Sequence, residues 1–484
     1  MSLSASLANA LTGLTASARA ASVVSSNVSN ALTEGYARRE LHLSPQSVGG
    51  RGAGVRVDGV TRVVDRTLLT DRRLADGEAG NARLKSGFLA RIEGMTGTPE
   101  DAGSLSARVA TLESALIQAA SRPDSQARLQ GAVDAATGLA GHLNALSDAL
   151  QRERMNADAG ISAQVRTLNE SLSGIDRLND EILAAAASGH DATALMDQRQ
   201  TLVDRVAAIV PVREVAREHD QISLYTTGGA ILLEGNPAVI GFSAAGVITP
   251  DMTIGSGALS GFTINGLAVP SSDSGALGGG TLGALVAIRD DLAPAAQVQL
   301  DAVARDLVER FESPAIDPTR GPGQPGLFTD NGAAFDPLIE EGLAGRIALN
   351  ALVDPRQGGQ LWRLRDGLGA AAPGSVGDAT LLQSLGTALS VARSPASGNF
   401  VGAARSASGL AADVLSGFAI SRQSAEARES FATARHDALK EMQLAQGVDT
   451  DAEMQTLLMV EQAYAANARV VQVIDDLIQQ LIGL

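Results

Sequence analysis

Residues 457–484 read LLMVEQAYAANARVVQVIDDLIQQLIGL. Apolar positions recur here at alternating intervals of three and four residues, which is the spacing of a helix that packs along one face. The first stripe comprises Leu457, Val460, Tyr464, Asn467, Val471, Ile474, Ile478 and Leu481. A second, adjacent stripe comprises Met459, Ala463, Ala466, Val470, Val473, Leu477, Gln480 and Leu484. Together they form an apolar face wider than one partner helix covers, so the sequence predicts several neighbours for this helix.

The beginning of the chain carries a matching stripe with the same spacing and mostly small side chains. It comprises Leu3, Leu7, Ala10, Leu14, Ser17, Ala21, Val24, Val28 and Ala31. We expect the two terminal helices to pair, which leaves the second C-terminal stripe for other chains. The predicted assembly seams are Leu3, Leu7, Leu14, Val24 and Val28, together with the first C-terminal stripe. Within that stripe, Asn467 is either a polar residue that fixes the register or an ordinary surface asparagine.

The middle of the chain predicts long helices interrupted by strands. Residues 37–64 alternate like a β-hairpin. A helix from Asp124 to Ala187 would be ~96 Å long if no break occurs near residues 156–160, which predicts an elongated molecule. Residues 212–280 are rich in Gly, Ser and Thr and contain β-favouring runs. Helical pattern then returns at 282–311 and at 378–446.

These patterns predict a mainly α, elongated fold with discontinuous domains and paired N- and C-terminal coiled-coil helices. Residues 1–36 and 447–484 form the predicted terminal assembly domain. A long-helix bundle is expected from residues 37–211 and 281–446, and a small β-rich outer domain from residues 212–280.

Composition excludes several classes of function. The 484 residues include 38 basic and 54 acidic side chains, and the net charge of −16 argues against binding to nucleic acid or to an anionic membrane surface. The absence of cysteine excludes disulfides and thiolate metal sites. We also expect no membrane insertion, because no apolar stretch of ~20 residues occurs, and no cleavable signal peptide.

The sequence offers no convincing catalytic, cofactor or metal site. The five histidines, His42, His142, His190, His219 and His436, are scattered without metal-binding spacing. Glycines 49, 50, 52 and 54 lack the Lys-Ser/Thr ending of a phosphate loop, so they are predicted to be turn glycines. Two acid–arginine groups, Asp197 with Arg199 and Asp204 with Arg205, belong either to a subunit contact or to an exposed helix face. We therefore predict that the chain is not an enzyme.

Three motifs resemble segments of bacterial flagellar axial proteins. Ser26-Asn27-Val28-Ser29-Asn30, followed by Gly35-Tyr36-Ala37-Arg38, is similar to the N-terminal signature of rod, hook and hook-associated proteins. The C-terminal signature of those proteins resembles two runs here, residues 447–454 (GVDTDAEM) and 462–469 (QAYAANAR). Residues 195–203 (LMDQRQTLV) are similar to a segment typical of the flagellar hook-associated protein 1 family.

This resemblance implies a structural subunit that joins hook to filament through its terminal helices. It implies contacts with identical subunits, with the hook protein and with the next junction protein on the filament side. It also implies export through the flagellar type III apparatus without a cleavable signal peptide, assisted by a cytosolic chaperone at the C-terminal helix. The alternatives are another axial protein (hook or flagellin-like), a secreted hydrolase or adhesin on a coiled-coil stalk, and a signalling coiled coil. The last is disfavoured by the lack of a membrane-spanning helix.

Overall fold

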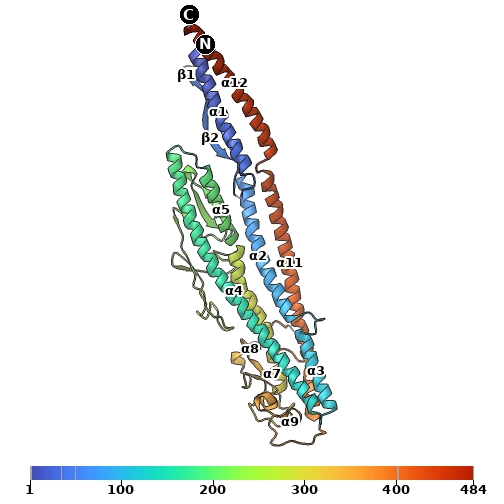
Figure 1. The fold of residues 1–484 in the computed structure, drawn as a ribbon. Coiled ribbons are helices and arrows are strands. Elements are labelled where there is room, and N and C mark those ends of the chain that lie inside the picture. Colours follow the sequence, from blue (N-terminus) through green and yellow to red (C-terminus); the bar gives the residue numbers. More distant parts are fainter. Residues whose placement is uncertain (1–2, 34, 49–50, 401–402, 483–484) are drawn as a thin grey trace. The chain divides into compact units, whose positions relative to one another are not determined.

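The computed structural model describes residues 3–33, 35–48, 51–400 and 403–482, so Gly49, Gly50 and Leu484 lie outside the described residues. The predicted mainly α class is confirmed: long helices occur at both ends and in the middle, with small antiparallel sheets between them (Figure 1). The chain divides into two compact units. Unit 1 comprises residues 1–79, 166–240 and 432–484, and unit 2 comprises residues 80–165 and 241–431. The three-domain division stays a prediction.

Unit 1 contains both terminal helices. Its elements are α1 (Leu3–Ser29), β1 (Arg39–Val48), β2 (Arg51–Arg62), the first part of α2 (Arg66–Thr96), the last part of α4 (Gln126–Ala187), α5 (Thr193–Ile209), β3 (Val212–Ala216), the 3-10 turn η1 (Glu218–Asp220), β4 (Ile222–Thr226), β5 (Ile231–Glu234), β6 (Asn236–Pro237), the end of α11 (Ala407–Ala445) and α12 (Thr450–Ile482). Strand β7 (Ile240–Gly241) lies at the boundary of the two units.

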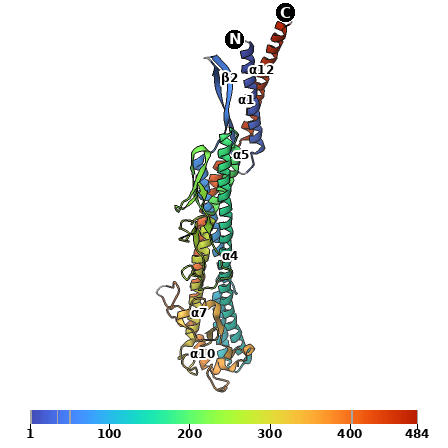
Figure 2. The same cartoon turned by 90° about the vertical axis from the view of Figure 1, so that its left-hand side faces the viewer.

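Helix α1 lies between the β1–β2 hairpin and α12 (Figures 1 and 2). The hairpin is antiparallel, with Arg39 opposite Arg62 at its open end. It approaches α1 closely at Gly54, where an added Cβ would lie 2.1 Å from the Thr12 hydroxyl oxygen. The turn-glycine prediction is therefore wrong for Gly52 and Gly54. Both lie inside β2, and Gly54 lacks a side chain because the strand packs against α1.

The four-stranded sheet β3-β4-β5-β6 is joined to α4 through asparagine side chains. Asn179 donates through Nδ2 to the Ile222 carbonyl (3.0 Å) and accepts from the Ile222 amide at Oδ1 (3.3 Å). Asn169 makes the same pair of bonds with Ile240, at 2.8 and 2.9 Å. Ile222 begins the central strand β4, and Ile240 begins β7, which belongs to a separate sheet; each asparagine amide satisfies one backbone amide and one carbonyl of a strand.

Unit 2 is a helical bundle with short strands. Its elements are the rest of α2, α3 (Leu105–Ser121), the first part of α4, β8 (Phe262–Ile264), β9 (Leu267–Val269), α6 (Gly280–Ala287), the π-helical segment η2 (Ile288–Leu292), α7 (Ala293–Glu312), β10 (Phe328–Asp330), η3 (Pro337–Ile339), α8 (Leu343–Arg346), β11 (Ile347–Leu349), η4 (Ala351–Val353), η5 (Pro355–Gln357), α9 (Trp362–Asp366), α10 (Thr380–Ser390) and most of α11.

Two helical expectations need correction in unit 2. The run predicted at 282–311 contains the π-helical segment η2 between α6 and α7. The run predicted at 378–446 is two helices, α10 and α11. In the connection between them, Arg393 and Arg405 form an isolated antiparallel bridge. The break considered near residues 156–160 does not occur, because α4 is continuous from Gln126 to Ala187.

A buried charge network lies along this part of α4. Arg289 in η2 is fully buried; its guanidinium donates from Nη1 to Asp158 Oδ1 (2.7 Å) and from Nε to Asp290 Oδ1 (2.8 Å). Asp158 Oδ2 accepts the Ala245 amide (2.7 Å). Arg154, one turn earlier on α4, donates to the carbonyls of Thr249 and Arg289, each at 3.0 Å. This face of α4 therefore organises the 245–260 loop.

Removing the Asp158 carboxylate should strongly destabilise unit 2. The variant Asp158→Ala leaves a buried arginine partly unpaired, and we expect a loss of about 3–5 kcal/mol in the free energy of unfolding. The matched control is Asp134→Ala, because the Asp134–Arg356 pair is more than half exposed on both sides and should contribute at most ~1 kcal/mol. Urea unfolding can be followed by the fluorescence of Trp362, the single tryptophan. Equal losses in the two variants would contradict this account.

Candidate assembly site

The N-terminal and C-terminal motifs meet at the buried side chain of Asn27. Its Nδ2 donates to the Arg39 carbonyl (2.9 Å) and to Glu453 Oε1 (3.0 Å). Its Oδ1 accepts from the Arg39 amide (3.0 Å) and from the Tyr36 hydroxyl (2.8 Å). The amide makes all four bonds of which it is capable. It thereby joins α1, the start of β1 and the first turn of α12.

Glu453, the acidic residue that binds Asn27, belongs to the C-terminal motif at residues 447–454. Glu453 is buried, and its Oε1 also lies 3.6 Å from Nη1 of Arg38. Asp449 begins the same helix, since its Oδ1 accepts the amides of Asp451 (3.0 Å) and Ala452 (3.1 Å). The two terminal signatures therefore form one hydrogen-bonded cluster.

The third motif, on α5, packs against the same segment. Asp197 Oδ2 accepts from Arg39 Nη2 (2.9 Å), and Oδ1 accepts from Arg62 Nε (2.8 Å) and from the Ala37 amide (3.3 Å). Arg39 and Arg62 are cross-strand neighbours, and like charges directly opposite one another destabilise a hairpin. The Asp197 carboxylate offsets that repulsion.

Gly35 allows α5 to approach this closely. It adopts φ +80°, and a Cβ added to it would lie 2.3 Å from the Thr201 hydroxyl oxygen. All three sequence motifs therefore meet inside unit 1, where they fix how the terminal helices, the hairpin and α5 pack together.

Neither alternative proposed for the acid–arginine groups describes the structure fully. Asp197 and Asp204 pair with arginines of the same chain, Asp204 with Arg72 Nη2 (2.7 Å) and Arg73 Nε (2.5 Å). Arg199 is buried and donates from Nη1 to Asn179 Oδ1 (2.8 Å) and to the Asp220 carbonyl (2.7 Å). Arg205 is exposed. Sequence reasoning missed Arg39 and Arg62, whose roles depend on the hairpin register.

The predicted seam residues lie where α1 and α12 face each other. Leu7 lines one small groove with Val471, Ile474 and Ile478. Val24 and Ile474 are buried; the half-buried members are Leu3, Leu7, Leu14, Val28, Leu457, Val460, Asn467, Val471 and Ile478. Tyr464 and Leu481 are exposed. The role of these residues in assembly stays a prediction.

Asn467 packs against α1 at Gly13. A Cβ added to Gly13 of α1 would lie 2.8 Å from the Asn467 side-chain amide, so Gly13 provides the space for it. Asn467 Nδ2 donates to the Ala463 carbonyl of its own helix (3.0 Å). It is thus a half-buried seam residue whose hydrogen bond is local.

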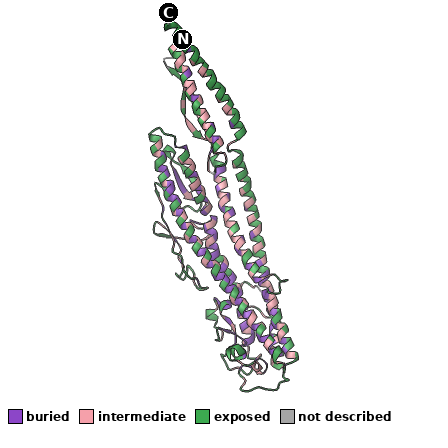
Figure 3. Ribbon diagram, viewed as in Figure 1, coloured by how far each residue is buried: buried purple, intermediate pink, exposed green. Residues whose placement is uncertain are grey.

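The second stripe of α12 faces away from α1. Its large members are exposed, with Met459 at 63% and Val473 at 57%, whereas Ile474 in the first stripe is 4% exposed. Figure 3 shows this exposed face along most of α12. Helix α1 covers the first stripe in part, since Tyr464 and Leu481 stay exposed, and the second stripe remains an apolar surface of unit 1.

The histidines do not come together. His42, His190 and His219 are exposed, His142 is half-buried, and His436 lies 3.6 Å from Asp76. Burial, followed by the charge of Arg108, lowers the pKa of His142. Across the described residues, no group of three or more His, Asp or Glu side chains could hold a metal ion. In the same part of the chain, no helix combines the length and apolar character needed to span a membrane.

Comparison with known proteins gives matches in the same regions. A family model described as the flagellar hook-associated protein FlgK helical domain matches residues 89–314. A second model, described as the flagellar basal body rod FlgEFG protein C-terminal, matches residues 442–484. Both regions are therefore similar to domains of flagellar proteins.

Curated relatives are similar to about half of the chain. The flagellar hook-associated protein 1 of Bacillus subtilis is 25% identical over 240 residues, covering 47% of each chain. That of Salmonella typhimurium is 26% identical over 243 residues, covering 49% of this chain and 44% of the relative. Together with the helical-domain match, they show that about half of this chain is similar to flagellar hook-associated protein 1. The matches span about half the length of these curated relatives.

One solved structure is also similar. The flagellar hook junction protein FlgK from Burkholderia pseudomallei aligns with 54% of this chain and 47% of its own at 20% identity, with a TM-score of 0.45. That TM-score is too low to establish a shared fold.

Removing the Asn27 side chain should loosen both terminal helices together. The variant Asn27→Ala leaves the buried Glu453 carboxylate with Arg38 alone and the Tyr36 hydroxyl with its 3.3 Å bond to Ser26 alone, and each lost bond should cost about 1–3 kcal/mol. Hydrogen–deuterium exchange should become faster at the end of α1 and in the first turn of α12. The control is Asn30→Ala, because Asn30 Nδ2 donates within its own turn, to the Ser26 carbonyl. Faster exchange in α1 alone would contradict a shared cluster.

The close approach at Gly35 can be separated from backbone strain. Gly35→Ala should lower the melting temperature more than Gly229→Ala, because both glycines have positive φ but an added Cβ at Gly229 meets nothing within 4 Å. Removing the Thr201 hydroxyl in the double variant Gly35→Ala/Thr201→Ala should recover part of the difference. Equal melting temperatures for the two single variants would show that Thr201 does not restrict this site.

Proposed function

We propose that this chain is a structural subunit of the bacterial flagellum that joins hook to filament and assembles through its terminal helices. The observation that carries the proposal is the second apolar stripe of α12, whose large members stay exposed although α1 packs against this helix. The family match supports the flagellar context, and the match at residues 442–484 lies on this same helix.

Burial supplies the driving force for assembly. Each Val, Leu or Met side chain transferred from water to an interface contributes about 1.5–3 kcal/mol. A stripe that repeats this contact along α12 can hold neighbouring chains, and repeated heterologous contacts generate rings or helical arrays. The proposed mechanism is mechanical coupling of two different polymers, with the terminal helices becoming fully packed on incorporation.

The proposed partners follow from this position. They are identical subunits through the terminal seams, the hook protein on one side, and the next junction protein on the filament side. Before assembly, a cytosolic export chaperone would cover the exposed stripe of α12. We propose that the chain is exported through the flagellar type III apparatus without a cleavable signal peptide and resides in the extracellular flagellum. It would act without catalysis, cofactor, nucleic acid or membrane insertion.

The alternatives receive less support. A hook or flagellin-like subunit would share the terminal helices, but the helical-domain match at 89–314 is to the hook-associated family. A secreted coiled-coil adhesin would not require the motif cluster around Asn27 to resemble axial-protein signatures.

Deletion of the chromosomal gene tests the junction role. We expect cells that make hooks but carry no filaments, with unpolymerised flagellin secreted into the medium, because the filament would have no attachment point. Electron microscopy of the cell surface and immunoblotting of the medium measure the two effects. Normal filaments would refute the proposal, and absence of the hooks themselves would indicate a hook or rod subunit instead.

Point variants test the stripe itself. The triple variant Val470→Ser/Val473→Ser/Leu477→Ser removes three exposed apolar side chains and should abolish complementation of the deletion strain. The purified variant should melt like the wild type, because these residues are not buried in the chain. The control, Gln479→Ser, changes an exposed polar residue of the same helix and should restore motility. Full complementation by the triple variant would contradict assembly through this stripe.

A further inference from the structure

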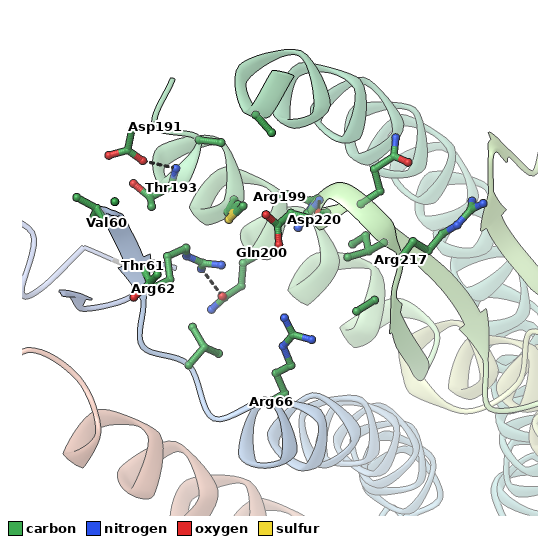
Figure 4. A pocket seen from close by; sticks show the side chains of 18 of the residues that line it. Val60, Thr61, Arg62, Arg66, Asp191, Thr193, Arg199, Gln200, Arg217 and Asp220 are labelled. Carbon is green, nitrogen blue, oxygen red and sulfur yellow. Dashed lines mark hydrogen bonds between the residues drawn. The ribbon is translucent and has the colours of Figure 1, made fainter. Parts of the chain in front are cut away.

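Unit 1 contains a pocket of about 710 Å³ whose walls are rich in arginine. This volume is typical of sites for small ligands, which range over ~300–1,000 Å³. The walls come from the end of β2, the start of α2, the start of α5 and the β3–β4 connection. Figure 4 shows Arg62, Arg66 and Gln200 extending their polar ends toward the middle of the pocket. All lining residues belong to unit 1.

The pocket lining carries more arginines than carboxylates, and two carboxylates outside the lining balance part of this excess: Asp197 pairs with Arg62, and Asp204 pairs with Arg73. Six arginines and four carboxylates line the pocket, in a chain with a net charge of −16. Two of these carboxylates have partners other than the lining arginines, and the third, Glu214, is bound to Arg73 of the pocket. Asp58 accepts from Arg56 (2.8 Å), Asp191 Oδ1 accepts the Thr193 amide (2.9 Å), and Glu214 Oε2 accepts from Arg73 Nη1 (2.7 Å). Among the described residues, Arg66 has no ion-pair partner.

Two buried polar groups of the pocket lack a hydrogen-bond partner in the described part of the chain. Arg73 is 3% exposed, and its Nη2 is unpaired although Nε and Nη1 are bound. Thr193, the first residue of α5, is 5% exposed with an unpaired Oγ1. An unsatisfied buried donor is unfavourable, and an arginine cannot lose its charge to relieve this.

The backbone at His219 and Asp220 and the pKa of Arg199 also indicate that the pocket is strained and crowded with positive charge. His219 and Asp220 both adopt positive φ, at 56° and 59°, so the turn that presents the Asp220 carbonyl to Arg199 is strained. Burial lowers the pKa of Arg199 to about 10; nearby Glu214 opposes this shift, while the charges of Arg62 and Arg66 add to it. Strained backbone of this kind persists where surrounding contacts enforce it, which is common at binding sites.

We propose that this pocket binds a small polyvalent oxyanion, carrying phosphate or carboxylate groups, held by Arg62, Arg66, Arg73 and the Thr193 hydroxyl. Arginine side chains present paired donors that match such oxygens, and the N-terminus of α5 adds a favourable dipole. The bound anion would join the hairpin, α2 and α5. The inference is independent of the proposed flagellar role, because it concerns the isolated chain.

Calorimetric titration of the purified full chain at low ionic strength tests the site. Inorganic pyrophosphate and citrate are the two probes, and they distinguish a phosphate from a carboxylate ligand. We expect one equivalent of at least one probe to bind, with affinity reduced about tenfold or more in Arg66→Gln, because a charge-assisted bond is lost. Arg66 is exposed and unpaired, so this variant should fold normally. A second variant, Thr193→Val, keeps the shape of the side chain and should also weaken binding.

The control is Arg205→Gln, which removes an equal charge from an exposed position of α5 outside the pocket. It should bind the probe like the wild type. If neither probe binds, the proposal is overturned. An equal loss of affinity in Arg205→Gln and Arg66→Gln would also overturn it, because the binding would then reflect general surface charge.

Discussion

The structure of unit 1 depends on one packing constraint: α12 carries two apolar stripes, and α1 packs against the first while the second stays exposed. Helix α1 is itself held between α12 and the β1–β2 hairpin, with glycines at both contacts, Gly13 toward Asn467 and Gly54 toward Thr12. Because glycines lie at these contacts, α1 can approach both α12 and the hairpin closely. The second stripe is left as an exposed apolar surface. Burying this surface against other chains would be favourable, which favours assembly through the terminal helices.

The position of α12 is fixed by polar contacts as well as by apolar ones. Asn27 uses every donor and acceptor of its amide, and Glu453 is buried against it. Buried polar groups of this type are unfavourable unless all are paired, so they favour a single register of α1 against α12. Asp197 likewise favours a single position of the hairpin against α5, because it bridges Arg39 and Arg62, which would otherwise repel one another.

Periodicity predicted the features that depend on neighbours within a helix. The terminal stripes, the continuous seam of α4 and the alternating hairpin segment follow from local spacing and are readable in the sequence. Contacts between distant segments are not. Nothing local places Asp197 beside Arg39, or Arg289 beside Asp158, because those pairs arise from register and from the π-helical segment at 288–292. Gly54 was misread for the same reason: its close neighbour, Thr12, lies on another element.

The central claim is that the second stripe of α12 is accessible in the isolated chain and covered in the flagellum. The chain has no cysteine, so Val473→Cys introduces a single thiol on that stripe, and its rate of maleimide labelling measures access directly. The account predicts rapid labelling of the purified chain and strong protection in intact flagella from a complemented strain. Equal labelling rates in the two states would contradict it.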